Sequence, residues 1–223
     1  MLTDLLRKMG FVAPGIEADK PAVGVSACLM GKAVRHDGGH RRHTRVHDEL
    51  ATLVRIVEAC PEVGIGLPVP RAPIQVVRLD GAPRVRGVMQ PQYDFTDALT
   101  AEADRLDEPL DGFVFKSRSP SCGLGTTPVH DAAGVPRELG NGAFAEALAR
   151  RHPGLPMANE TDLDGARFAD AFVLRVFCHH YWRRGGDLDA LRQRAARLDQ
   201  PLRSDMRRFL DRLTVTAPPP TAR

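Results

Sequence analysis

Apolar residues recur with different periods along the chain, and each change of period predicts a new element. Residues 21–29 (PAVGVSACL) form a continuous apolar run before a glycine-rich turn, as expected of a buried strand. Residues 45–58 repeat apolar side chains three and four positions apart, which predicts an amphipathic helix. A second helix is predicted over residues 95–106, with Asp94 as its cap, and residues 112–119 (GFVFKSRS) are predicted to be another strand.

Between these elements, residues 58–79 contain two short apolar runs that flank a proline-rich turn. Beyond Gly142 the pattern is helical only. Phe144 and Leu148 mark one helix, and Asp164 is placed to cap a longer one. The apolar stripe of that longer helix consists of Ala169, Phe172, Val173, Val176 and Phe177. Two short amphipathic helices are expected to follow it.

Strands that alternate with helices of about 10 to 15 residues are typical of parallel βαβ units. We therefore predict an α/β fold in which a parallel sheet of βαβ units carries a helical C-terminal extension. The expected boundaries are an α/β domain over residues 1–160, the helical extension over residues 161–213 and a flexible tail over residues 214–223.

Composition and charge narrow the class of protein. Of 223 residues, 43% are hydrophobic and 26% are charged, as in an ordinary globular protein. The net charge of +3 is too small, and the basic residues too poor in neighbouring aromatics, to indicate a nucleic-acid polymer as partner. No apolar stretch is long enough for a membrane span, and the N-terminus lacks the apolar core of a signal peptide. We expect a cytoplasmic protein with no bound nucleotide cofactor, since the glycine-rich phosphate motifs are missing from the sequence.

Three of the four cysteines lie at the ends of predicted strands. Cys28 closes the first strand, Cys60 opens CPEVGIG, and Cys122 follows the strand that begins at residue 112. Ligands gather at the carboxyl ends of parallel strands, so these thiols can converge despite their separation in sequence. Three thiolates suit zinc with a fourth ligand, or an iron–sulfur cluster with one iron free of protein. The alternative is three buried cysteines that only contribute to packing.

Longer motifs around these cysteines make the chain recognisable. Residues 23–42, 60–74 and 112–125 resemble, in this order, three signatures of a bacterial family that includes the thiouracil desulfurases. They read VGVSACLMGKAVRHDGGHRR, CPEVGIGLPVPRAPI and GFVFKSRSPSCGLG. Residues 140–163 are similar to the family's usual continuation. The resemblance extends over roughly residues 21–183. No property of the family is assigned to the C-terminal residues beyond it.

The resemblance implies a site and a chemistry. In the desulfurase branch three cysteines hold a 4Fe-4S cluster, and these fall on Cys28, Cys60 and Cys122, with one iron open for the sulfur of the substrate. The catalytic glutamate and serine of that branch fall on Glu62 and Ser119. A Lewis acid draws electrons from a thiocarbonyl, a carboxylate activates water, and a hydroxyl relays a proton. The net reaction is non-redox: a thioamide and water give an amide and sulfide.

Turns next to the three cysteines contain further candidates for substrate binding. These are Arg35, Asp37, His40, Arg71 and Ser121. The sequence offers other roles for two of them. Asp37 is equally suited to an Asx turn. Arg71 is as well suited to solvent as to an anionic substrate or a cluster sulfide.

Other polar residues near these motifs have simpler interpretations. His36, His40, His43 and His47 have helical spacing, but Asp37–Gly39 interrupt the helix that a zinc site would need. Cys178 is expected to pack inside a helix. Lys116 and Arg118 would lower the pKa of nearby thiols, although strand alternation predicts that they point away from Ser117 and Ser119.

The sequence thus predicts an iron–sulfur-dependent desulfurase for a small thiolated heterocycle such as 2-thiouracil, acting as a monomer or small homo-oligomer. One alternative is another reaction on the same open cluster, such as sulfur transfer or dehydration. The second is a non-enzymatic module that binds a cluster or zinc. Glu62 and Ser119 discriminate between them, because a metal carrier needs no acid–base pair beside its ligands.

Overall fold

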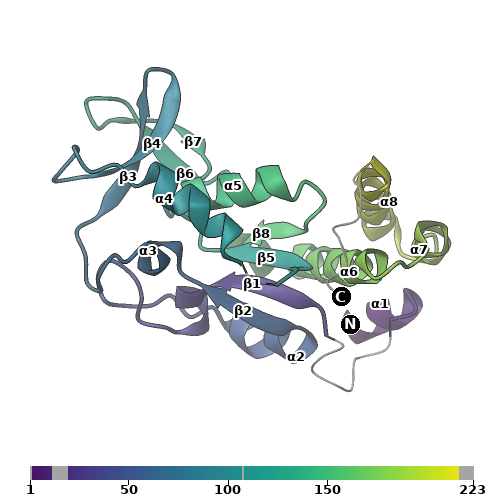
Figure 1. Ribbon diagram of the computed structural model, residues 1–223. Coiled ribbons are helices and arrows are strands. Elements are labelled where there is room, and N and C mark those ends of the chain that lie inside the picture. Colours follow the sequence, from purple (N-terminus) through teal and green to yellow (C-terminus); the bar gives the residue numbers. More distant parts are fainter. Residues whose placement is uncertain (1, 12–19, 107, 216–223) are drawn as a thin grey trace.

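The computed structural model describes residues 2–11, 20–106 and 108–215. Its strands form two four-stranded sheets (Figure 1). The first sheet has the order β2–β1–β5–β8, and all its neighbours are parallel. Its strands are β1 (Ala22–Ser26), β2 (Arg55–Ala59), β5 (Gly112–Phe115) and β8 (Met157–Asn159). The predicted α/β fold with a parallel sheet and C-terminal helices is confirmed.

Strand β5 is buried on both faces, which explains its unbroken apolar run. Phe113 and Phe115 pack against Phe144 of α5 (Ala143–Arg151), while Val114 belongs to the core on the other face, which includes α6 (Ala166–Arg183). Gly24 of β1 lies directly beside Phe113. A Cβ atom at Gly24 would lie 2.2 Å from the Phe113 ring, so the close approach of the two strands requires glycine.

The second sheet is mixed and has the order β4–β3–β6–β7. Strands β3 and β6 are parallel, and the two outer pairs are antiparallel. Its strands are β3 (Ile74–Leu79), β4 (Ala82–Gly87), β6 (Thr127–His130) and β7 (Pro136–Gly140). Figure 1 shows this sheet at one side of the molecule and the C-terminal helices at the other.

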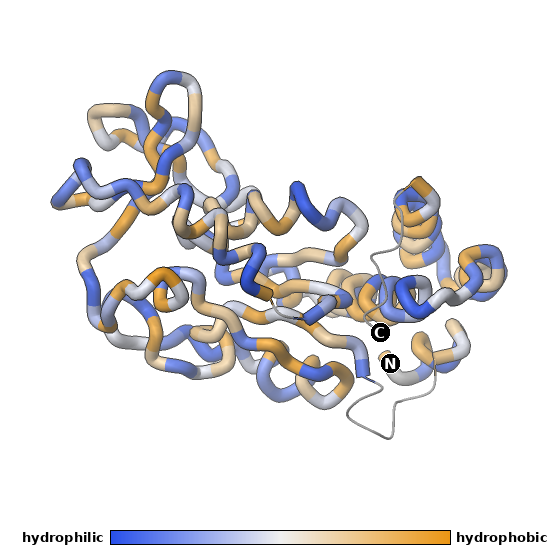
Figure 2. The backbone as a smooth tube through the Cα atoms, in the orientation of Figure 1, coloured by the Kyte–Doolittle hydropathy of each residue, from blue (hydrophilic) through white to orange (hydrophobic). Residues whose placement is uncertain are grey.

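The remaining elements are helices and single turns. The α-helices are α1 (Leu2–Lys8), α2 (Ala51–Leu53), α3 (Pro61–Gly64), α4 (Thr96–Ala101), α7 (Leu188–Ala195) and α8 (Gln200–Val215). The others are η2 (Ala27–Met30), η3 (Arg45–Leu50), η4 (Glu102–Asp104) and η5 (Glu160–Asp164), of which η3 is a π-helix. Apolar and polar residues alternate along the C-terminal helices (Figure 2), and α8 buries Met206, Phe209, Leu210 and Leu213.

The helix predicted over residues 45–58 is wrong in its second half. Helical structure ends at Leu53, Val54 is extended with φ −128° and ψ 162°, and β2 follows. The apolar residues that matched the helical period there are two valines, Val54 and Val57, and valine fits a strand better than a helix. Parallel pairing of β2 with β1 therefore overrides the local period.

Three further expectations are corrected. The strand predicted over residues 112–119 ends at Phe115, and the helix predicted over residues 95–106 runs from Thr96 to Asp104 with a 3-10 turn at its end. The chain beyond Gly142 is not helical only, because β8 extends the parallel sheet beside β5. A strand of three residues is too short for its period to be visible in the sequence.

The C-terminal region packs directly on the parallel sheet. Phe172, Val173 and Val176 of α6 belong to the same core as Val23 and Val25 of β1. The cap of α6 is Gly165, where Asp164 was expected. Helix α8 has 16 residues and is longer than expected; it reaches Val215 of the predicted tail, and residues 216–223 lie outside the described part. The domain boundary at residue 160 stays a prediction.

Candidate functional site

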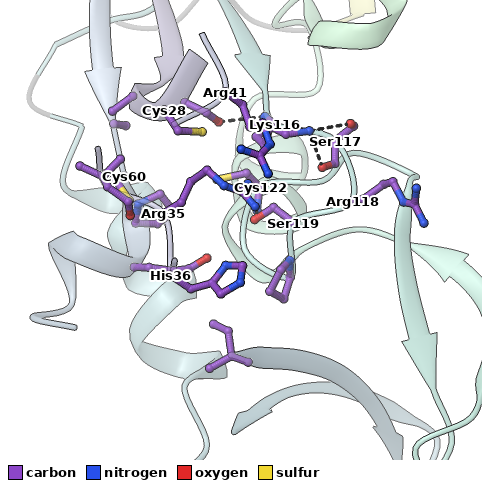
Figure 3. Close-up of a pocket in the computed structure, with 18 of the residues that line it drawn as sticks. Cys28, Arg35, His36, Arg41, Cys60, Lys116, Ser117, Arg118, Ser119 and Cys122 are labelled. Atoms are coloured by element: carbon purple, nitrogen blue, oxygen red, sulfur yellow. Dashed lines mark hydrogen bonds between the residues drawn. The ribbon is translucent and has the colours of Figure 1, made fainter. Parts of the chain in front are cut away.

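Three cysteines line one cavity at the carboxyl ends of neighbouring parallel strands. Cys28 lies in η2 directly after β1, Cys60 precedes α3 directly after β2, and Cys122 lies in the turn after β5. Since β2, β1 and β5 are adjacent, their ends meet, and the cavity there has a volume of about 490 Å³. Figure 3 shows the three side chains facing the same space.

All four cysteines are free thiols, and burial dominates the chemistry of the three in the cavity. Burial raises the pKa of Cys28 to about 11, an effect that Arg35 opposes and Cys60 reinforces. Burial likewise raises the pKa of Cys60 and, far more, that of Cys122, although a hydrogen bond with Ser26 favours the Cys122 thiolate. Metal ions bind the thiolate, so metal binding here would release protons.

Within the described ranges, no group of three or more His, Cys, Asp or Glu side chains is arranged around a single metal ion. In a 4Fe-4S cluster each thiolate binds a different iron, so the three thiols need not converge on one point. The donor set of Cys28, Cys60 and Cys122 fits such a group chemically. Arg35 and Lys116 also lie close enough to Cys28 to favour its thiolate electrostatically.

Glu62 lies in α3, two residues after Cys60, and both of its carboxylate oxygens are held. Its Oε2 accepts a hydrogen bond from Arg71 Nε at 2.8 Å and forms an ion pair with Arg71 Nη2 at 2.7 Å, and its Oε1 accepts a hydrogen bond from Ser121 Oγ at 2.8 Å. The Glu62 and Arg71 side chains are only 13% and 5% exposed. The carboxylate is therefore oriented at the cavity wall by a buried ion pair.

Arg71 and Ser121 were predicted to bind substrate, but their polar groups are engaged within the protein. Arg71 Nη2 also donates to the backbone oxygen of Val34 at 2.9 Å, and Ser121 is completely buried. Both residues contact Glu62 directly. Ser121, which does not line the cavity, therefore supports the carboxylate from behind. Arg71 supports it too but also lines the cavity, so its role in substrate binding stays a prediction.

Ser119 lies on the cavity wall in the turn between β5 and Cys122. Its Oγ accepts hydrogen bonds from the backbone N–H groups of Ser121 at 3.3 Å and Cys122 at 3.1 Å. Both contacts use the oxygen as acceptor and leave the hydroxyl hydrogen available to donate. Ser119 thus shapes the turn that positions Cys122 and can also present a donor to the cavity.

Arg35 lines the cavity as expected, and Figure 3 shows it running between Cys60 and Cys122. Its buried Nε has no hydrogen-bond partner among the described residues, and Asp37 Oδ1 lies 3.5 Å away. Asp37 forms the Asx turn, accepting from Gly39 N at 2.9 Å. Asp37 and His40 lie exposed on the loop that follows, outside the cavity wall.

Lys116 does not point away from Ser117, as strand alternation had predicted. Because β5 ends at Phe115, alternation no longer applies, and Lys116 Nζ donates to Ser117 Oγ at 3.0 Å. Lys116 also forms an ion pair with Glu160, a buried carboxylate that the sequence did not single out. Arg118, in contrast, is directed away from the three cysteines (Figure 3).

Of the four spaced histidines that were not expected to form a metal site, His36 lines the cavity (Figure 3), which the sequence did not single out. The others lie outside the cavity wall, as does Cys178. His43 Nε2 bonds Asp164 at 3.1 Å and His47 Nδ1 bonds Asp48 at 2.6 Å, so these histidines serve local contacts. Cys178 is completely buried in the core around α6, where burial raises the pKa of its thiol.

The fold and cavity together define an α/β protein with a three-cysteine pocket at the carboxyl edge of its parallel sheet. A family model described as 2-thiouracil desulfurase matches residues 23–160, and the chain belongs to this family. The matched segment contains all three cavity cysteines, Glu62 and Ser119. The resemblance expected from the sequence motifs is thereby confirmed.

A solved structure supports the same conclusion. The chain is similar to the [4Fe-4S]-dependent thiouracil desulfidase TudS, with 32% sequence identity and a TM-score of 0.56. The similarity covers 70% of this chain and 99% of TudS. No curated protein matches the chain significantly. None of the helices in the described ranges is both long and apolar enough to span a membrane. Family and structural neighbour together indicate a thiouracil desulfidase-like function.

Proposed function

We propose that the protein is a 4Fe-4S-dependent desulfidase that removes sulfide from a small thiolated heterocycle such as 2-thiouracil. One observation carries this proposal: Cys28, Cys60 and Cys122 line the same cavity as Glu62 and Ser119. TudS, a [4Fe-4S]-dependent thiouracil desulfidase, supports both the cofactor and the reaction. The four free thiols suit a reducing compartment, so we also propose that the protein acts in the cytoplasm.

Cys28, Cys60 and Cys122 would hold the cluster as thiolates and leave one iron without a protein ligand. When bound, such a cluster supplies a Lewis acid that polarises the thiocarbonyl of the substrate. Arg35 can compensate negative charge there, since it lines the cavity and already favours the Cys28 thiolate electrostatically. The protein's own contribution is to exclude bulk water and to orient the reacting groups.

Glu62 would accept a proton from the attacking water. Arg71 and Ser121 fix the orientation of its carboxylate, which general base catalysis requires. Ser119 donates its hydroxyl hydrogen towards the charge that develops on the substrate. Oxygen from water replaces sulfur on the carbon, the sulfur leaves as sulfide with the protons of water, and no electron is transferred.

Iron and sulfide analysis of protein purified without oxygen tests the cofactor. We expect about four irons and four sulfides per chain, together with release of sulfide from 2-thiouracil. Cys60→Ser should lose the cluster, whereas the matched variant Cys178→Ser, which changes a thiol of the helical core, should keep it. Stoichiometric zinc without visible absorption would refute the cluster.

The two alternative functions that the sequence leaves open are outcomes of the same experiment. A protein with a full cluster that releases no sulfide from any thiolated pyrimidine would favour sulfur transfer or dehydration. A cluster or zinc carrier would likewise release no sulfide, and it would keep its metal content in Glu62→Gln and Ser119→Ala. The buried ion pair around Glu62 favours the enzyme, because a carrier needs no oriented carboxylate.

A further inference from the structure

Glu160 is a buried carboxylate to which the proposed reaction assigns no role. It follows β8 directly, at the start of η5, and is 5% exposed. A buried charge is costly unless it is paired and hydrogen-bonded. The partners of Glu160 therefore indicate what it does.

Every contact of the Glu160 carboxylate goes to the start of the turn that contains Ser119 and Cys122. Its Oε2 accepts a hydrogen bond from Ser117 N at 2.6 Å. Its Oε1 accepts one from Ser117 Oγ at 2.8 Å and also pairs with Lys116 Nζ. Two successive residues of the turn are thus tied to one carboxylate.

The residue before Glu160 holds the other end of the same turn. Asn159 Oδ1 accepts from Leu124 N at 3.0 Å, and Asn159 Nδ2 donates to Leu124 O at 2.8 Å. Ser119 and Cys122 lie between the two attachments. The last residue of β8 and the first of η5 therefore clamp the turn at Ser117 and Leu124.

Lys116 links this ion pair to the cavity that contains the cysteines. Lys116 Nζ donates to Ser117 O at 3.1 Å, and Lys116 lines the cavity with Cys28. The backbone N–H of Lys116 donates at 2.9 Å to Ser26 Oγ, which in turn is hydrogen-bonded to Cys122. The ammonium of Lys116 favours the charged form of Cys28, and the carboxylate of Glu160 disfavours it.

We propose that Glu160 is a positioning residue of this site: it fixes the turn that presents Ser119 and Cys122, and it balances the Lys116 ammonium beside Cys28. The proposal rests on the proposed function for two readouts, the reduction potential of the bound cluster and turnover. A further readout, hydrogen exchange of the turn in metal-free protein, judges it independently.

The experiment compares Glu160→Gln, Glu160→Asp and Lys116→Met with the wild type and with Glu108→Gln. Glu108 pairs with Arg55 outside the cavity wall, so its variant controls for the loss of an ion pair elsewhere. Hydrogen exchange of residues 117–124 is measured in metal-free protein. We expect faster exchange in Glu160→Gln and in Glu160→Asp, whose shorter side chain cannot reach Ser117 N, and no change in Glu108→Gln.

In the anaerobic holoprotein the reduction potential of the cluster is the second readout. Reduction adds negative charge, so Glu160→Gln, which leaves the Lys116 ammonium unbalanced, should raise the potential. Lys116→Met should lower it, the double variant should return towards the wild type, and Glu160→Asp should stay near it. Opposite shifts would show that both charges act on the cluster, whereas no shift in either variant would indicate an ion pair that is only structural.

Turnover of 2-thiouracil is the third readout. Removing a residue that holds a metal ligand or reacting group in place usually lowers activity by about 10- to 100-fold. We expect a fall of this size in kcat for Glu160→Gln, with KM nearly unchanged. If Glu160→Gln matches Glu108→Gln in all three readouts, the inference is wrong. If the wild type carries a cluster but releases no sulfide, the proposed function fails while exchange and potential still judge Glu160. If no cluster binds, the exchange measurement decides.

Discussion

The two ends of strand β5 both carry buried charges, yet the structure uses them differently. At the amino end, the Asp111 carboxylate is completely buried and accepts hydrogen bonds from Ala22 N at 3.0 Å, His180 Nδ1 at 2.8 Å and Arg183 Nε at 2.9 Å. At the carboxyl end, Lys116 pairs with Glu160 at the wall of the three-cysteine cavity.

The amino end is a closed network. Asp111 binds the backbone of β1 and the side chains of α6, so it joins the parallel sheet to the C-terminal helices. His179 Nδ1 also lies within hydrogen-bond distance of Asp111 Oδ1, at 3.3 Å. A carboxylate with this many internal donors has no free capacity for a ligand, and we assign it an anchoring role.

At the carboxyl end of β5, some hydrogen-bond donors have no acceptor within the part of the protein that the structure describes. Ser119 uses its oxygen in the turn but retains its hydrogen, and Arg35 Nε makes no hydrogen bond within the described ranges, although Asp37 Oδ1 lies 3.5 Å away. Burial alone therefore does not distinguish a functional charge from a structural one. The presence of unused donors beside a cavity does.

The largest effect is expected from substitutions of Glu62 and Ser119, which lie in the cavity at the carboxyl end of β5 and should affect turnover. Glu62→Gln removes a base and Ser119→Ala removes a hydroxyl, so each should lower turnover per intact cluster by roughly 10²- to 10⁴-fold. Iron content measured on the same samples should change little. The free energy of unfolding of Ser119→Ala should fall by about 1–3 kcal/mol, because the backbone N–H groups of Ser121 and Cys122 lose their acceptor. Turnover per cluster close to the wild type in both variants would contradict the assigned roles.

Asp111→Asn should show the reverse pattern. Removing one partner of a buried charge network costs about 3–5 kcal/mol, because Arg183 would be left without its counter-ion. Urea unfolding measures this loss. Turnover of the folded variant should equal that of the wild type, and a loss of turnover without a loss of stability would show that the anchor and the cavity are coupled.

Acidification should weaken the anchor. Burial opposes the ionised form of Asp111, but hydrogen bonds from His179, His180 and Arg183 outweigh it and lower the pKa below the usual value of 3.8. The stabilisation is therefore fully present above about pH 4 and is lost as the pH falls through the folded-state pKa. The stability difference between wild type and Asp111→Asn, from unfolding at several pH values, should shrink below pH 4. A constant difference would contradict this.

The smallest effect is expected from Ser121→Ala. It removes the hydrogen bond to Glu62 Oε1 and leaves the Arg71 ion pair intact. One hydrogen bond to a charged group contributes about 1.5–3 kcal/mol, and we expect a loss of about tenfold in kcat at full iron content. If kcat is unchanged, Arg71 alone suffices to orient the carboxylate.

Local sequence patterns correctly predicted those elements whose apolar spacing matches the secondary structure that they adopt in the fold. The buried run before Cys28, the run over residues 112–115 and the stripe of α6 all lie where expected. Cys28, Cys60 and Cys122 were predicted to meet because parallel strands end at one edge, and all three line the cavity. The motifs around them were sufficient to predict the family.

Other features depend on pairing between distant segments. Val54 and Val57 fit a helical period, and only pairing with β1 makes Arg55–Ala59 a strand. In the mixed sheet, β3 pairs with β6 although the two segments lie far apart in the chain. No local pattern of apolar residues predicts this pairing. Hydrogen bonds between such segments decide these elements.

The sequence by itself determined which chemical groups are present at the site: three thiols, a carboxylate and a hydroxyl, each in a short motif at a predicted strand end. Only the tertiary structure decided their supports. Ser121 lies 59 residues from Glu62, and Glu160 lies 43 residues from Ser117. The reason is physical: a motif specifies the residues of one turn, whereas a buried charge takes its partners from whatever segment the packed chain brings within hydrogen-bond distance.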